Sequence, residues 1–309
     1  MNQFIDHHIV ARKILFDFKN TPRHWVHGDP FATHIINVLN VAITPIEHWF
    51  CRLANKTLPY VTDPNLIADL KGFIAQEAAH ANAHKGSDIY FKSHDIDTAD
   101  FKKFVDWVFK NVLSDSPFGT NKFLKSHERL WLAYRMGMIA VWEHYFCSFG
   151  TWVLDAKGLE GSDPVMLDII RWHGAEEVEH RTVAYDAYRA LAGDGIKSYI
   201  LRQASAATAF PIMVIGWLGV GYYLCMIDKS PEAQKIAQNK NPLSFVWKFH
   251  QASKLDRLPK IMSVFKSLKH WSSFSYHPEH DGDVAKALAY IANSPAHQLM
   301  SINSKLEKR

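Results

Sequence analysis

The residues with the clearest chemical meaning lie near the middle of the chain, where two histidines and several glutamates stand at helical spacing. Residues three and four apart share one face of a helix, so His173, Glu177 and His180 would form a narrow stripe. Glu176 would lie at the edge of that stripe. Burying a carboxylate beside two imidazoles is costly unless an opposite charge balances it. The stripe therefore predicts a metal-binding face.

A second motif of this type stands earlier in the chain. Glu77 and His80 are three positions apart, one above the other on a predicted helix. His84 continues the stripe one turn further, about 5.4 Å along the axis. That offset favours a place beside the ligands or in a substrate pocket. Direct ligation by His84 or Glu176 stays open as an alternative.

Two further glutamates complete the candidate set. Glu47 and Glu143 each lie in an apolar helical stretch, where a charged side chain needs a partner. The predicted metal ligands are Glu47, Glu77, His80, Glu143, His173, Glu177 and His180. Carboxylates and imidazoles without a thiolate fit iron or manganese better than zinc. Four carboxylates would neutralise two divalent cations, so we expect two iron ions, with manganese and zinc as alternatives.

Helix-start signals define the elements that must carry these ligands. Aspartate followed by proline, an N-cap and a first-turn proline, occurs at Asp29, Asp63 and Asp163. Strand and hairpin signals are scarce, and apolar residues recur at spacings of three and four. The predicted ligand-bearing helices cover residues 29–56, 63–86, 120–156 and 163–192, and a further amphipathic helix covers residues 98–113.

The ligands fall into two matched halves. Glu77 follows Glu47 by 30 positions and Glu177 follows Glu143 by 34, so each half fits one helical hairpin. A Glu on each of two helices plus Glu-x-x-His on each of the other two is the pattern of di-iron and di-manganese carboxylate proteins. We therefore predict an all-α, ferritin-like four-helix bundle with a long crossover and additional C-terminal helices. The expected domains are an arm (1–28), the bundle (29–193) and a helical extension (194–309).

The motifs resemble those of two known families. The pattern of Glu47, Glu77-x-x-His80, Glu143 and His173-x-x-x-Glu177-x-x-His180 is similar to the ligand set of the di-iron arylamine N-oxygenases, such as p-aminobenzoate N-oxygenase. That similarity covers about residues 30 to 190, and it implies that a third histidine joins the site. As a whole, the chain resembles a bacterial family described as predicted metal-dependent hydrolases, which has the same motifs followed by an apolar stretch.

Two reactions fit a pair of ions in this setting. The first expectation is an oxidoreductase that uses dioxygen and two irons to oxidise a small, apolar organic substrate, with electrons from a donor protein or another reductant. The alternative is a metal-dependent hydrolase, in which the ion pair lowers the pKa of a water and polarises an ester or phosphoester oxygen. A metal-binding or storage protein without a substrate is a second alternative.

Composition limits the class of protein. The chain has 309 residues, of which 48% are apolar, so it can bury a large core. The three cysteines are far apart in apolar stretches, which predicts neither a disulfide framework nor a thiolate metal site. The first residues carry acidic and polar groups where a signal peptide needs a positive start and an apolar run. These features predict a cytoplasmic protein.

An apolar stretch and a basic segment follow the predicted bundle. Residues 204–227 carry no formal charge, and residues 229–271 hold nine Lys or Arg against two acids, a net charge of +7. The expected apolar helix is buried against the bundle or dips into one membrane leaflet, and a full membrane span is the third alternative. The local charge favours an anionic surface over nucleic acid as a partner. A homodimer also stays open.

Overall fold

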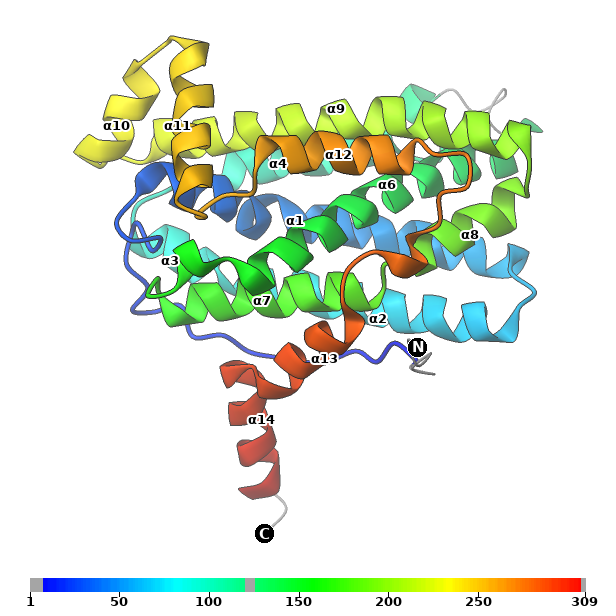
Figure 1. Cartoon of the computed structure of the whole chain (residues 1–309), viewed down its shortest axis with the longest axis horizontal. Helices are drawn as coiled ribbons and strands as arrows, with labels where there is room; N and C mark the ends of the chain where they lie inside the picture. The colour runs from blue at the N-terminus through cyan, green and yellow to red at the C-terminus, as the bar shows by residue number, and fades with distance from the viewer. Residues whose placement is uncertain (1–7, 120–125, 307–309) are drawn as a thin grey trace.

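The computed structural model describes residues 8–119 and 126–306, and every regular element in these ranges is helical. The all-α class predicted from the sequence is therefore confirmed. Four long helices lie at the centre of the molecule (Figure 1). They are α1 (Pro30–Thr57), α2 (Pro64–Gly86), α6 (Glu128–Asp155) and α7 (Pro164–Glu179). This arrangement is compatible with the ferritin-like bundle expected from the ligand pattern.

Three of these helices begin at the aspartates that the sequence marked. The side chain of Asp29 accepts hydrogen bonds from the backbone N–H groups of Phe31 and Ala32. Asp63 and Asp163 cap α2 and α7 in the same way, and a proline follows each aspartate. These caps satisfy N–H groups that lack partners within the helix. The predicted starts of α1, α2 and α7 are confirmed.

The bundle consists of two hairpins joined by a long crossover. α1 packs along α2, α6 packs along α7, and the second hairpin contacts the first through α1 and α6. The predicted start of the third long helix at Thr120 lies outside the described residues, which resume at residue 126. The described crossover contains α3 (Asp88–Ser93), α4 (Ala99–Trp107), a π-helical turn (Val108–Val112) and a 3-10 turn (Pro117–Gly119).

The fourth predicted helix is wrong in its length. The expected helix over residues 163–192 is divided into α7 and α8 (Val183–Ala192), with a short turn between them. His180 caps α7 with φ −100° and ψ 18°, in the bridge region rather than the helical one. Arg181 donates one hydrogen bond to the last turn of α7 and another to the carbonyl oxygen of Glu279, 98 positions away. His180 therefore lies at the end of α7, where the regular spacing of helical residues no longer sets the direction of its side chain.

α6 and α7 approach each other closely where two glycines face. A Cβ atom on Gly150 would lie 2.0 Å from the carbonyl oxygen of Gly174. A Cβ atom on Gly174 would lie 2.8 Å from the Cα atom of Gly150. Only glycine fits at both positions, because a larger residue would place its Cβ against the facing backbone. This close crossing sets the distance between the helix that carries Glu143 and the helix that carries Glu177.

Further helices cover the two hairpins. α8 and α9 (Ile196–Ile227) pack on α6, and α9 also packs on α1. Later in the chain, α12 (Ile261–Trp271) lies on α6 and α13 (Val284–Asn293) lies on α7. The remaining C-terminal helices are α10 (Pro231–Gln238), α11 (Pro242–Lys254) and α14 (Pro295–Leu306), and 3-10 turns occur at Leu58–Tyr60, Lys157–Leu159 and Pro278–His280.

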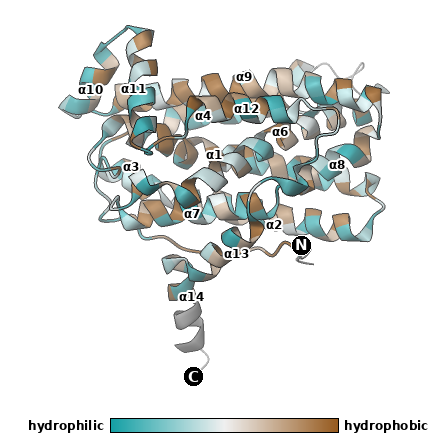
Figure 2. Ribbon diagram, in the orientation of Figure 1, coloured by the Kyte–Doolittle hydropathy of each residue, from teal (hydrophilic) through white to brown (hydrophobic). Residues whose placement is uncertain are grey.

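Among the described residues, α9 is the helix that is long and apolar enough to cross a membrane. Only 22% of its most apolar 18-residue window is buried. The expectation of a helix buried against the bundle therefore holds only for its inner side, which packs on α6 and α1. Figure 2 shows hydrophobic residues along α9 at the outer edge of the molecule.

Candidate metal centre

All the principal predicted ligands lie at the centre of the four helices. None of these residues is more than 1% exposed. They are Glu47 from α1, Glu77 and His80 from α2, Glu143 from α6, His173 and Glu177 from α7, and His180 from the C-cap of α7. Four buried carboxylates in one place require positive charge beside them.

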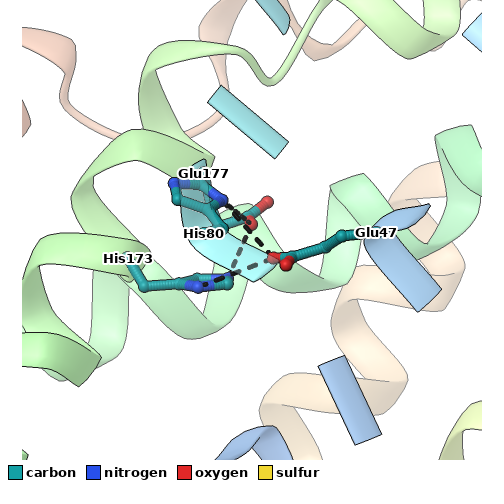
Figure 3. A group of neighbouring side chains, drawn as sticks. All are labelled: Glu47, His80, His173 and Glu177. Carbon is teal, nitrogen blue, oxygen red and sulfur yellow. Dashed lines mark ion pairs between the residues drawn. The ribbon is translucent and has the colours of Figure 1, made fainter. Parts of the chain in front are cut away.

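One group of four side chains is shown in Figure 3. The donor atoms of Glu47, His80, His173 and Glu177 all lie within 4.8 Å of one another. Glu47 Oε1 is 3.4 Å from His80 Nδ1 and 3.8 Å from His173 Nδ1. Glu177 Oε1 is 2.8 Å from His173 Nε2 and 3.8 Å from His80 Nδ1. The side chains point toward one another from three helices, which is how ligands surround a common ion.

A second group adjoins the first. Its members are Glu77, His80, Glu177 and His180, whose donor atoms also lie within 4.8 Å of one another. His180 Nε2 is 3.4 Å from Glu77 Oε1, and His180 Nδ1 is 2.8 Å from Glu143 Oε2. Because His80 and Glu177 belong to both groups, the two groups share an edge. A carboxylate at such an edge is placed to contact two neighbouring cations.

Most of these donor atoms lack a well-directed hydrogen bond. Within the described residues, the buried atoms without a hydrogen-bond partner include both oxygens of Glu47, Glu77 and Glu143, one oxygen of Glu177, His80 Nδ1, His173 Nε2 and both nitrogens of His180. An unsatisfied buried polar atom costs about 1–3 kcal/mol, and more when it is charged. Such atoms are rare in folded proteins, and here they converge. The donor set therefore fits divalent cations.

Burial makes several of these carboxyl groups weak acids when no cation is bound. It raises the pKa of Glu47 and Glu77 well above the ordinary value, and the charge of Glu177 raises both further. Burial and Glu177 also raise the pKa of Glu143 to about 8. For Glu177, burial would raise the pKa, but the histidines beside it lower it below the ordinary value. A bound cation would reverse the upward shifts, because an opposite charge favours the ionised form.

His80 Nε2, the nitrogen on the far side of the ring from the candidate ligands, contacts a carboxylate that is paired with an arginine. His80 Nε2 lies 2.7 Å from Glu176 Oε2, and Arg12 donates to Glu176 at 2.8 Å and to Glu179 at 2.6 Å. Gln76 donates to Glu179 as well. A carboxylate on the far nitrogen of a histidine fixes the ring and leaves the near nitrogen, here Nδ1, for a metal. The structure thus places Glu176, the less favoured ligand candidate, as the partner of His80.

Sequence reasoning missed Arg12. It lies in the N-terminal arm, 164 positions from Glu176, and no local pattern indicates its position. Burial would lower its pKa, but the hydrogen bond to Glu179 and the charge of Glu176 raise it above the ordinary value. The available signal was indirect, because three buried acids close together on α7 need a cation from elsewhere in the chain.

His84 extends the row of histidines at one end of the centre. Its Nε2 lies 2.8 Å from His173 Nδ1, and its Nδ1 lies 2.8 Å from Asn40 Oδ1. Because an amide oxygen only accepts, His84 Nδ1 carries the proton, and His84 Nε2 accepts one from His173 Nδ1. His173 Nε2, which faces Glu177, then has a free lone pair for a cation. His84 is thus a hydrogen-bond partner of the candidate ligand His173.

A smaller cluster joins the N-terminal arm to the end of α9. Asp228 Oδ2 lies 2.8 Å from both His24 Nε2 and His34 Nε2, and the three side chains are close enough to share an ion. Asp228 Oδ1 already accepts hydrogen bonds from Arg23 and from the backbone N–H of Ser230. The guanidinium neutralises the carboxylate, so we interpret this cluster as an internal tether of the arm.

Comparison with known proteins identifies the family. A family model described as predicted metal-dependent hydrolase matches residues 10–282. The matched range includes all the principal candidate ligands and Arg12. No curated protein and no solved structure matches the chain. Because the model covers most of the sequence and the motifs agree with the predicted resemblance, the chain belongs to the family of predicted metal-dependent hydrolases.

Proposed function

We propose that this chain is a dinuclear metalloenzyme. One ion would bind Glu47, His80 and His173, the other would bind Glu77, Glu143 and His180, and Glu177 would lie between them. The observation that carries this proposal is the pair of adjoining four-residue groups that share His80 and Glu177. The buried donor atoms without hydrogen bonds in the same residues support it.

We propose hydrolysis as the reaction, in line with the family to which the chain belongs. Two bound cations would supply a water of lowered pKa and would polarise the carbonyl or phosphoryl oxygen of the substrate. The chain would hold the ligands in a dry interior, because every candidate ligand is buried. Glu176 would keep the proton on His80 Nε2, so that His80 Nδ1 stays available.

Aromatic side chains would exclude bulk water on one side of the centre. Trp49, Phe50 and Trp142 form a cluster with ring centroids 5.7 to 6.0 Å apart. They stand on the helices that carry Glu47 and Glu143, and all three are buried. Electrostatic contacts are stronger in such a low-dielectric surrounding. A substrate that reaches this interior would be small and largely apolar, with one ester-like or phosphoester-like polar group.

The ligand set favours a second candidate reaction. Glutamates and Glu-x-x-His motifs on four helices match the pattern of di-iron and di-manganese carboxylate proteins. Oxygen ligands combined with imidazole also suit iron and manganese. With ferrous iron bound, the chain would be an oxidoreductase that uses dioxygen on a small apolar substrate, and it would require an external electron donor. The similarity to the arylamine N-oxygenases supports the same alternative.

Metal analysis tests the part that both reactions share. The chain is purified without oxygen, loaded separately with zinc, manganese or ferrous iron, and analysed for bound metal after gel filtration. We expect two ions per chain for at least one of these metals. Binding of fewer than one ion per chain for all three would overturn the dinuclear proposal. Iron uptake far beyond two ions per chain would indicate storage instead.

Two assays then separate the reactions. The zinc- and manganese-loaded protein is tested on p-nitrophenyl acetate and p-nitrophenyl phosphate, and the ferrous protein is tested for dioxygen uptake with an oxygen electrode. Metal-dependent cleavage that disappears in Glu177→Gln supports hydrolysis. Sustained dioxygen uptake with a reductant, and no cleavage by any metal form, overturns hydrolysis in favour of the oxidative reaction. Glu232→Gln, an exposed substitution on α10, is the matched control in both assays.

A further inference from the structure

Several large apolar side chains of α9 face away from the bundle, although others pack against it. A surface helix of a globular protein normally turns its apolar stripe toward the core. The buried residues of α9 are instead mostly small or polar: Ser198, Arg202, Ser205, Ala206, Ala209, Gly221, Leu224 and Cys225. The exposed large residues are Ile196, Ile200, Ile212, Ile215 and Met226. Ile215 is 71% exposed, so α9 carries large apolar side chains on its outer side as well as against the core.

α12 exposes apolar and basic side chains on one arc. With Met262 at zero and 100° per residue, Phe265 lies at about −60°, Lys269 at about −20° and Lys266 at about +40°. All four residues are exposed. A helix that keeps lysines beside exposed methionine and phenylalanine suits an interface between water and lipid, where both kinds of group find a partner.

α11 repeats this pattern. Leu243, Val246, Trp247 and Lys254 also fall within an arc of about 100°, and all are exposed. Trp247 is 58% exposed and Leu243 is 74% exposed. Tryptophan is enriched where one end of its ring is in an apolar phase and the other end is wet. The pattern on α11 is therefore that of an interfacial helix.

α9 contacts α11 directly and is linked to α12 through Tyr145 of α6. The ring of Tyr145 in α6 packs against that of Phe210 in α9, with centroids 5.4 Å apart, and its hydroxyl donates to the carbonyl oxygen of Val264 in α12. Tyr222 of α9 packs against Phe245 of α11 at 5.9 Å. We define the apolar face as the exposed large residues of these helices: Ile196, Ile200, Ile212, Ile215, Met226, Leu243, Val246, Trp247, Met262 and Phe265. Figure 2 shows hydrophobic colour on all three helices.

The exposed charges of residues 229–271 indicate which kind of partner would bind the apolar face. Within residues 229–271, the exposed charged side chains are Lys229, Lys235, Lys240, Lys254, Lys260, Lys266, Lys269 and Glu232. A second copy of the chain, docked through the same face, would bring these lysines against each other. Anionic lipid headgroups would complement them, while the apolar side chains enter the acyl boundary.

We propose that the apolar face binds bilayers that contain anionic lipids, with α9 lying in the plane of the interface. A full span is disfavoured because the inner side of α9 packs on both α6 and α1. Arg202, buried on that inner side, also donates hydrogen bonds to Tyr185 and to the carbonyl oxygen of Ser273. This proposal does not depend on the reaction proposed for the metal centre.

Vesicle co-sedimentation of the full chain tests the proposal. One set of vesicles contains phosphatidylcholine alone, and the other contains phosphatidylcholine and phosphatidylserine in equal parts. We expect the chain to sediment with the phosphatidylserine vesicles, to bind the neutral vesicles much more weakly, and to be released by high salt. The double substitution Lys266→Gln and Lys269→Gln should weaken binding by about 30-fold.

Apolar substitutions test the second contribution. Trp247→Ser combined with Phe265→Ser should weaken vesicle binding by about tenfold or more. High salt should release this variant at least as easily as it releases the parent chain. Because all substituted side chains are exposed, each variant should fold, which circular dichroism checks. Matched controls are Lys71→Gln on α2 and Ile89→Ser on α3, both exposed and away from the apolar face. These controls should bind as the parent chain does.

Three results would overturn the proposal. The first is no binding to either set of vesicles at low salt. The second is vesicle binding that is the same in the parent chain, in the Trp247→Ser and Phe265→Ser variant, and in the Lys266→Gln and Lys269→Gln variant. The third is a parent chain that does not bind vesicles but forms a dimer in light scattering, when Trp247→Ser with Phe265→Ser dissociates that dimer. The apolar face would then join two copies of the chain.

Discussion

Glu177 reaches both ligand groups from one position on α7. Its Oε1 lies 2.8 Å from His173 Nε2, and its Oε2 lies 3.9 Å from His180 Nε2. The two oxygens of one carboxylate therefore face histidines of different groups. Its pKa lies below the ordinary value although burial acts in the opposite direction, because His180 and His173 stabilise its charge. It is the carboxylate best prepared to stay ionised before a metal binds.

Glu177→Gln should remove the proposed bridge while keeping the size of the side chain. We expect the bound metal to fall from two ions to at most one per chain, because an amide oxygen carries no charge and binds divalent cations more weakly. Plasma emission analysis of the purified variant measures the content. Retention of two tightly held ions would contradict the bridging position.

Arg12 supplies positive charge to two buried carboxylates, and its removal should destabilise the fold. Arg12→Gln leaves Glu176 and Glu179 without their cation, and breaking a buried pair in this way costs about 3–5 kcal/mol. Urea unfolding of the metal-free protein measures the change. The neighbouring exposed residue gives a matched control, Lys13→Gln, which should shift the free energy of unfolding by less than about 0.5 kcal/mol. Equal effects of the two substitutions would refute the ion-pair assignment.

Metal affinity should increase as the pH rises through the neutral range. Burial and Glu177 raise the pKa of Glu143 to about 8. Burial lowers the pKa of His180, but Glu143 and Glu177 raise it to about 9. The Glu143–His180 pair therefore keeps a proton through the neutral range, and a cation must displace it. Titration calorimetry in buffers of different ionisation enthalpy should detect proton release, and an affinity that does not change with pH would contradict this assignment.

At the scale of elements, α7 has the largest part in building the centre. It carries His173 and Glu177 on one face, crosses α6 at a glycine contact, and ends at His180. The hydrogen bond from Arg181 to Glu279 fastens this helix end to the C-terminal part. α7 thus provides three of the candidate ligands from two backbone conformations, one helical and one not.

Alanine at the glycine contact should force α6 and α7 apart. Gly150→Ala should destabilise the protein by about 1–3 kcal/mol or more, because the new Cβ would lie 2.0 Å from the carbonyl oxygen of Gly174. Gly216→Ala on α9 has open space and should instead stabilise by up to about 1 kcal/mol, since alanine is the better helix former. Thermal and urea unfolding measure both. A neutral Gly150→Ala would show that the two helices can separate freely.

At the scale of the whole molecule, segments far apart in sequence close the bundle. The N-terminal arm brings Arg12 to α7, and α13 packs on the same helix from the C-terminal side. Tyr290 of α13 donates to Asp168 of α7, and the backbone N–H of Ala296 donates to the same carboxylate. Both ends of the described chain therefore pack on α7, the helix that carries His173 and Glu177, so metal binding and global stability should be coupled.

Metal removal should lower the stability of the entire fold. A ligand that binds only the folded state at a hundred times its Kd stabilises by about 2.7 kcal/mol. We expect a chelator to lower the Tm by several degrees, and the difference to grow from neutral to mildly alkaline pH. The sign follows because the raised pKa of Glu143 makes the metal-free folded state bind more protons than the unfolded state, so its stability falls as pH rises toward about 8. Scanning calorimetry measures the difference, and an unchanged Tm after chelation would argue against a cation within the core.

Local sequence signals predict the starts of three bundle helices and most of the residues of the candidate centre. Aspartate-proline pairs mark helix starts through local hydrogen bonds, and Glu77-x-x-His80 places two ligands on one face by helical geometry alone. The charge of Glu47 or Glu143 in an apolar helix is also a local signal, because a buried carboxylate needs a partner. These inferences require only the regular periodicity of a helix.

Contacts between distant segments depend on packing that no local sequence pattern predicts. The break at His180 involves Arg181 and a carbonyl 98 positions away, and the support of His80 depends on Arg12, 164 positions from Glu176. Which apolar side chains of α9 face outward could not be predicted either, because its sequence is apolar on nearly every side and has no single apolar stripe. Periodicity fixes which residues share a helix face, whereas packing fixes what that face meets.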